Sequence, residues 1–282
     1  MGARATGNVV LLAVVMGLAW LAFTGEEPPP PQGLPLTTLD PGAIERISLE
    51  RGGRRVAVLA RDADGWRLVE PLEARADPFR VRALLTLASA ESDTGFRAAG
   101  NDLSQYGLQP PQAIVRFDAT PVQVGGTESV SGRRYLLSGD QVHLLEDRWF
   151  GAIAAGPAAW VDPRPLPEGA RVVALELPAA RWTLVDGRWQ RDPADPRLSA
   201  DAGPTLVQSW QRARALAVRP LDPSLDWRER VLIRTRDAQS PLVLEVARIE
   251  DAVLFAHRDL GVQYRFLARQ GAVLLGEPAG GG

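Results

Sequence analysis

The chain has 282 residues, of which 45% are hydrophobic and 23% are charged, a composition typical of globular proteins. At roughly 150 residues per domain, this length predicts about two domains. The formal net charge of -2 predicts no bulk attraction to nucleic acid or anionic lipid. The chain contains no cysteine, and its 32 Lys-plus-Arg residues are all arginine. This excludes disulfides, thiol nucleophiles, thiolate metal sites, and chemistry that needs a lysine.

An apolar run near the amino end predicts a transmembrane helix. Val9–Phe23 carries no charge, with Arg4 before it and Glu26 and Glu27 after it. The positive-inside rule then leaves the amino terminus in the cytoplasm and exports everything that follows. Residues 1–25 are therefore assigned to a cytoplasmic start and a single-pass anchor in a bacterial inner membrane. The alternative is a cleaved signal peptide, because the run is short for a membrane span.

Proline and glycine mark the segments next to the folded part. Residues 26–40 form a Pro-rich linker, in which Pro28–Pro31 predict a polyproline II spacer between the membrane and the first folded residue. A disordered tether is the alternative for this segment. Residues 277–282 predict a flexible tail.

An internal repeat organises the rest of the chain. Val56–Val69 alternates apolar and polar residues around an Asp64-Gly65 turn, which predicts a β-hairpin. Trp182–Arg191 repeats this pattern around Asp186-Gly187. Equivalent points in the two copies are separated by roughly 120 residues, and closing hairpins end each copy.

A helix follows each hairpin. Asp77 is the predicted N-cap of the first helix, with Pro78 at its first position. The apolar residues of this helix then share one helical face: Val81, Leu84, Leu85 and Ala88. The counterpart begins at Asp201, and its apolar face contains Leu206, Val207, Trp210 and Ala213.

These patterns predict an α+β fold, in which an N-terminal transmembrane helix precedes two tandem related modules. Each module is expected to be a mainly antiparallel sheet covered by one helix. The first module is assigned to residues 41–167 and the second, degenerate copy to residues 168–276. The boundary lies in Asp162–Gly169, where three prolines prevent regular structure.

The first copy resembles a known bacterial family. The motif residues that carry the resemblance include Trp66, Pro71, Asp77, Tyr106, Gly107, Leu108 and Pro111. Together with Arg164-x-Leu166, they resemble the bacterial domain-of-unknown-function family 4340 over about Ile44 to Pro167. The resemblance implies a membrane-anchored envelope protein associated with auxiliary components of gliding-motility-type ABC transport systems. It implies no catalytic residues, and the motif residues have structural explanations: Gly107 suits a left-handed helix end, and Tyr106 suits a buried ring.

Several short motifs resemble parts of known catalytic or metal-binding sites, but residues that those sites require are missing. His257-Arg258-Asp259-Leu260 matches the start of a kinase catalytic loop, but Tyr264 occupies the expected Asn position, so a hairpin turn is predicted instead. Asp62-x-Asp64-Gly65 lacks the later Glu of a calcium loop and predicts a turn. His143 falls in an alternating strand and is interpreted as a sheet residue. The sequence therefore predicts no catalytic, cofactor or metal site.

The leading functional hypothesis is a non-enzymatic, membrane-anchored periplasmic accessory or scaffold protein. Its expected partners are the inner membrane and envelope or ABC-transporter-type proteins, with no nucleic acid and no cofactor. The first alternative is a periplasmic module that binds a small molecule, lipid or glycan in a cleft between the two copies, which a deep apolar pocket with converging arginines would favour. The second alternative is a carboxylate-based hydrolase, which would need an acidic pair in a groove.

Overall fold

The computed structural model describes residues 33–277. The transmembrane helix predicted for Val9–Phe23, the Pro28–Pro31 spacer and most of the glycine tail lie outside the described residues. Within residues 33–277, every helix is too short or too polar to cross a membrane.

The described part of the chain is built mostly of β-strands. It contains three antiparallel sheets, of nine, eight and two strands, whereas its longest helices have 11 residues each. The predicted α+β class with an N-terminal transmembrane helix is therefore wrong for the described fold. An 11-residue helix is about 17 Å long, whereas nine strands at ~4.8 Å spacing span about 38 Å. One such helix cannot cover the face of one of these sheets.

The first large sheet has the strand order β5-β4-β3-β2-β8-β9-β10-β11-β7. Its strands are β2 Arg46–Arg51, β3 Arg54–Asp62, β4 Gly65–Glu70, β5 Ala74–Arg75, β7 Gly95–Arg97, β8 Ala113–Phe117, β9 Thr120–Thr127, β10 Arg134–Ser138 and β11 Gln141–Leu145. The predicted hairpin around Asp64-Gly65 is β3 and β4. His143 lies in β11 and is buried, as predicted for a sheet residue.

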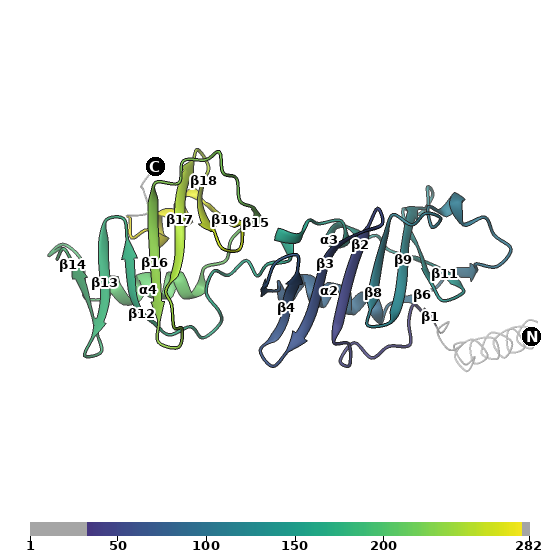
Figure 1. Ribbon diagram of the computed structural model, residues 1–282, viewed down its shortest axis with the longest axis horizontal. Helices are drawn as coiled ribbons and strands as arrows, with labels where there is room; N and C mark the ends of the chain where they lie inside the picture. Colours follow the sequence, from purple (N-terminus) through teal and green to yellow (C-terminus); the bar gives the residue numbers. More distant parts are fainter. Residues whose placement is uncertain (1–32, 278–282) are drawn as a thin grey trace, which may run out of the picture.

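The second large sheet has the order β14-β13-β12-β16-β17-β18-β19-β15. Its strands are β12 Val172–Leu177, β13 Ala180–Val185, β14 Arg188–Asp192, β15 Ala217–Pro220, β16 Glu229–Thr235, β17 Leu242–Ile249, β18 Ala252–His257 and β19 Val262–Leu267. Apart from the short β5, the strands follow one another in the same order in both sheets. The two sheets lie at opposite ends of the long axis in Figure 1.

One polar turn is reproduced in detail in both halves. Asp102 accepts hydrogen bonds from the backbone N (3.1 Å) and the hydroxyl (2.6 Å) of Ser104. Asp222 accepts the same two bonds from Ser224, at 2.9 and 2.6 Å. In each case the serine lowers the pKa of the carboxyl group. The similarity between the halves therefore extends from strand order to individual side-chain contacts.

Two helices of equal length pack beside the sheets, α2 Pro78–Ala88 and α4 Ala202–Arg212. Asp77 caps α2 as predicted, because its side chain accepts a hydrogen bond from the backbone N of Phe79. Asp201 precedes α4 but makes no such bond. The shorter helices are α3 Phe150–Ile153, α5 Ala268–Leu274 and the 3-10 turns η1 Leu103–Tyr106 and η2 Pro157–Trp160. One continuous cluster of buried apolar side chains runs through both sheets and their helices.

Both ends of the described chain are attached to the core. Leu34–Pro35 forms β1, which pairs with β6 Glu91–Ser92. The Thr37 hydroxyl donates to the carbonyl of Ala88 at 2.7 Å, so the last part of the predicted 26–40 linker is packed structure. At the other end, Glu277 forms an ion pair of 2.6 Å with Arg248.

Candidate functional site

The two large sheets meet at the junction segment, residues 160–168. Its backbone bonds to both sides: the Asp162 amide donates to the Arg75 carbonyl at 2.8 Å, and the Ala215 amide donates to the Pro163 carbonyl at 2.9 Å. Arg75 ends β5, at the edge of the first sheet, whereas Ala215 lies just before β15, at the edge of the second. The junction segment therefore ties the edges of the two sheets together.

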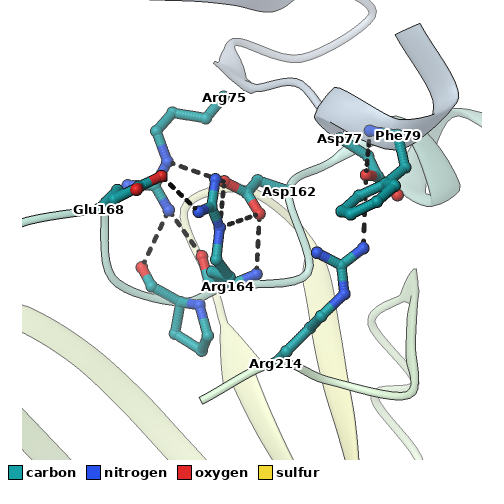
Figure 2. Close-up of polar contacts among 8 residues, drawn as sticks. Arg75, Asp77, Phe79, Asp162, Arg164, Glu168 and Arg214 are labelled. Atoms are coloured by element: carbon teal, nitrogen blue, oxygen red, sulfur yellow. Dashed lines mark hydrogen bonds and ion pairs between the residues drawn. The ribbon is translucent and has the colours of Figure 1, made fainter. Parts of the chain in front are cut away.

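Asp162 is the centre of a charged cluster in the junction segment. Its side chain is only 3% exposed. It accepts hydrogen bonds from the backbone N of Arg164 at 3.0 Å, and from Nε and Nη2 of the same residue at 3.1 and 3.0 Å. Figure 2 shows Arg75 approaching the same carboxylate from the first sheet, with Nε at 3.5 Å from Oδ2. The hydrogen bonds with Asp162 are the main cause that raises the pKa of Arg164, to which Glu168 also contributes.

A second charged contact crosses the junction at Asp77. Besides capping α2, the Asp77 carboxylate lies 3.6 Å from Nη2 of Arg214, which precedes β15 at the edge of the second sheet. The Arg214 guanidinium also lies over the ring of Phe79, 4.6 Å from its centroid, and Figure 2 shows these three side chains together. The predicted motif residue Asp77 thus combines a local role in α2 with a contact between the two halves.

The junction groove, a hollow of about 920 Å³, opens beside this cluster. Its walls come from the β3–β4 turn, from α2, from the junction segment and from Asp237 of the second half. The α2 residues that line it are Pro78, Val81, Arg82 and Leu85, the spacing of a single helix face. Trp66 lines the groove from β4, and the guanidinium of Arg61 lies 5.2 Å from the centroid of its ring.

Four other motif residues gather away from the junction. Tyr106 ends η1, and its ring lies 5.0 Å from that of Phe96 and 4.9 Å from that of Tyr135. Gly107 has φ +64°, which confirms the predicted left-handed helix end. Leu108 is buried in the same apolar cluster and bridges to Pro111. These contacts are packing contacts at the β9–β11 side of the first sheet.

Pro71 follows β4 and is exposed, apart from both groups of motif residues. The structure therefore divides the seven motif residues: Trp66 lines the junction groove, Asp77 contacts Arg214 of the second half, and the remaining five lie elsewhere in the first half.

A family match decides the relationship of the chain to known proteins. The profile of the family described as "Domain of unknown function (DUF4340)" matches residues 66–226, more than half of the chain. The chain belongs to the DUF4340 family. No curated protein and no solved structure shows significant similarity to it. The DUF4340 match begins at Trp66 and continues past residue 167, so it includes the whole junction segment and the first strands of the second sheet.

Sequence reasoning missed the importance of the junction residues in this DUF4340 chain. It treated Asp162–Gly169 only as a proline-rich boundary, although its charged residues form a cluster with Arg75 around the buried Asp162. The available signal was an Asp and an Arg of opposite charge, two residues apart in a proline-rich segment that also contains the apolar Val161 and Leu166. Charged residues in an otherwise apolar segment indicate a buried pair when both sides of the segment are covered.

The motifs that resemble a calcium loop and a kinase catalytic loop both form turns in the structure. The backbone N of Asp64 donates to Asp62 at 2.9 Å, within the predicted turn. His257 ends β18 and is followed by the predicted turn into β19. Within residues 33–277 there is no group of three or more His, Asp or Glu side chains arranged to hold a metal ion.

Proposed function

We propose that the chain is a non-enzymatic accessory protein of the bacterial cell envelope, and that it binds a protein component of an ABC-type transport system through the junction groove. The observation that carries this proposal is the composition of the groove wall. The first half and the junction segment build most of it, and Asp237 joins it from the second half, so the groove lies where the two halves meet. A partner held there has a defined position relative to both sheets.

The side chains of the groove suit a protein partner. Trp66, Val81 and Leu85 supply an apolar floor, and exposed charged side chains such as those of Arg82 and Asp64 stand at the rim. Protein interfaces commonly combine an apolar, aromatic centre with a polar rim. The tryptophan is the side chain expected to contribute most to binding, since interface hot spots are enriched in Trp, Tyr and Arg.

The proposed location of the folded part, outside the inner membrane, rests on the sequence. Arg4 before the apolar run Val9–Phe23 supports export of the folded part to the periplasmic side of the inner membrane. The association with gliding-motility-type ABC transport systems comes from the family resemblance.

Site-specific photo-crosslinking in cells tests the binding surface. A photoreactive residue at Arg82, on the rim, should give a reproducible adduct that contains an ABC transport component. The same residue at Val130, which is 91% exposed and is not part of the groove wall, is the matched control and should give no such adduct. The Trp66→Ala variant should reduce the Arg82 adduct. Identical adducts from both positions, or none from Arg82, would overturn the proposed surface.

The proposed location has a separate test. Alkaline phosphatase fused to the carboxyl end is active only after export, so an active fusion supports the periplasmic location. A fusion that is expressed but inactive contradicts it.

A further inference from the structure

A second hollow, the junction cavity, lies on the side of the junction segment that faces the second sheet. Its volume is about 320 Å³. The first half contributes Arg67, Ala74 and Arg75, and the second half contributes residues of β16, β17, β18 and β19 and of the loop before β17. The volume lies at the lower end of the ~300–1,000 Å³ range of ligand pockets, so a ligand that fits it is small.

Most of the cavity wall is apolar. The apolar side chains come from the junction segment and the second half and include Val161, Leu166, Ile233, Leu242 and Leu260, besides three prolines. Val161, Leu166 and Ile233 are each 3% exposed or less, so this part of the wall is already packed from behind by the core. Such a wall stabilises the apolar body of a ligand by removing it from water.

Seven polar or charged residues also line this space: Arg67, Arg75, Asp162, Thr235, Ser240, His257 and Tyr264. Nε of Arg75 and Nδ1 of His257 are both buried, and neither has a hydrogen-bond partner among the described residues. Tyr264 is 3% exposed, and burial raises its pKa to about 12, so its hydroxyl is neutral. A buried donor without a partner, such as Nε of Arg75, is unfavourable, and a ligand that supplies an acceptor removes that penalty.

The unused hydrogen-bond donor of Arg75 suits an anionic ligand. Asp162 is the only acidic residue of the wall, and its carboxylate already accepts hydrogen bonds from Arg164. Nη2 of Arg75 donates to the carbonyl of Arg164 at 2.6 Å, whereas Nε, 3.5 Å from Oδ2 of Asp162, makes an ion pair but no hydrogen bond. Burial lowers the pKa of His257, so its ring adds no charge near neutral pH. Arg164 pairs with Glu168 at 3.0 Å as well as with Asp162, whereas Nε of Arg75 makes no hydrogen bond and can donate one to a ligand carboxylate.

We propose that the junction cavity binds a small monocarboxylate with an apolar body. Its carboxylate accepts hydrogen bonds from Arg75 and Tyr264, and its body packs against Leu166, Ile233 and Leu242. This site is separate from the junction groove and does not depend on the proposed protein partner. Because both halves build it, the bound ligand contacts the first sheet through Arg75 and the second through Tyr264.

The two histidines of the chain provide a direct test. His257 lines the cavity, whereas His143 is buried in β11, near the opposite edge of the first sheet. The full-length chain, without an affinity tag and with labelled histidine, is titrated in detergent with 4-phenylbutyrate while the ring signals are followed by NMR. The signals of His257 should shift saturably and those of His143 should not. Parallel shifts of both, or no shift up to millimolar ligand, would overturn the proposal.

A matched ligand isolates the role of charge. The neutral 4-phenylbutyramide has nearly the same shape, and detergent takes it up at least as well as the carboxylate. A charge-assisted hydrogen bond predicts that the amide binds roughly ten- to a hundredfold more weakly than the carboxylate. Equal affinity of the two ligands would contradict a carboxylate site.

Variants assign the binding groups. Arg75→Gln should weaken 4-phenylbutyrate about tenfold or more, and Tyr264→Phe, which keeps the ring and its packing, should weaken it severalfold. Arg116→Gln is the control, since Arg116 lies in β8 and pairs with Glu50 away from the cavity. Thermal unfolding of each variant establishes that it is folded. Unchanged affinity in folded Arg75→Gln and Tyr264→Phe would refute the assigned contacts.

Discussion

Nε of Arg75 lies 3.5 Å from Oδ2 of Asp162, and this ion pair connects the edge strand of the first sheet with the segment that leads to the second. Asp162 is almost fully buried, whereas the Arg75 and Arg164 side chains are 36% and 28% exposed. The Asp162 carboxylate is therefore the most buried charged group of the junction, and both arginines contact it.

Removal of this carboxylate should destabilise the protein. Asp162→Ala removes the buried acceptor that two guanidinium groups share, but Arg164 keeps Glu168, Arg75 keeps the carbonyl of Arg164, and both reach water in part, so we expect a loss of about 2 kcal/mol in the free energy of unfolding. Asp226→Ala is the control, because the Asp226–Arg228 pair is 62% and 82% exposed and should contribute less than about 1 kcal/mol. Urea unfolding of both variants measures the difference. Equal losses would contradict a structural role for the buried pair.

The two helix starts provide a comparison within one chain. Asp77 caps α2 with a hydrogen bond of 3.0 Å to the backbone N of Phe79, whereas Asp201 makes no cap bond at the start of α4. Asp77→Ala should therefore lower the free energy of unfolding by about 1 kcal/mol, and Asp201→Ala should change it by less than half of that. Thermal unfolding monitored by circular dichroism tests both variants. A larger effect at Asp201 would show that the cap bond is not what stabilises α2.

The motif glycine should not tolerate a side chain. Gly107 has φ +64°, and a Cβ at this position would lie 2.9 Å from the backbone N of Gly126. Gly132 has φ +70° with open space around it, so Gly132→Ala measures the backbone strain alone, about 1–2 kcal/mol. Gly107→Ala should cost more than this because of the added backbone clash. Denaturant unfolding measures the loss of stability in both variants. Equal losses would mean that the segment around Gly107 shifts to avoid the clash without a further loss of stability.

The hydroxyl of Tyr264 should lose its proton only at unusually high pH. Burial raises its pKa to about 12, compared with an ordinary value of 10.0. The unfolded chain releases this proton near pH 10 while the folded chain retains it. The free energy of unfolding should therefore fall as the pH rises from 10 to 12, by up to about 2–3 kcal/mol.

Absorbance of tyrosinate near pH 12 measures this directly, since the chain has only three tyrosines. Tyr264→Phe should remove the latest step of the titration curve and flatten the fall in stability. A late step that survives this substitution would assign it to another tyrosine.

Much of the local structure was predictable because the residues that determine each turn or helix start are close together in the sequence. The Asp64-Gly65 and Asp186-Gly187 turns join the predicted hairpins, and Asp77 caps the predicted helix. The helix α5 was not predicted, because its seven residues are too few to show a helical period. The family was also recognisable, since its motif depends on residue order. The match to the DUF4340 profile confirms the predicted family.

By itself the sequence determined the hairpins, the cap of α2, the turn at Gly107 and the family, all of which depend on neighbouring residues or on their order. Only the tertiary structure decided that the sheets extend to nine and eight strands and outweigh the helices, because strand pairing joins segments far apart in the chain. It also decided that Arg75, Asp162 and Tyr264 meet at one junction, although they lie in three separate segments of the sequence. The proline-rich boundary is a candidate site because both sheets pack around it and bring these side chains together.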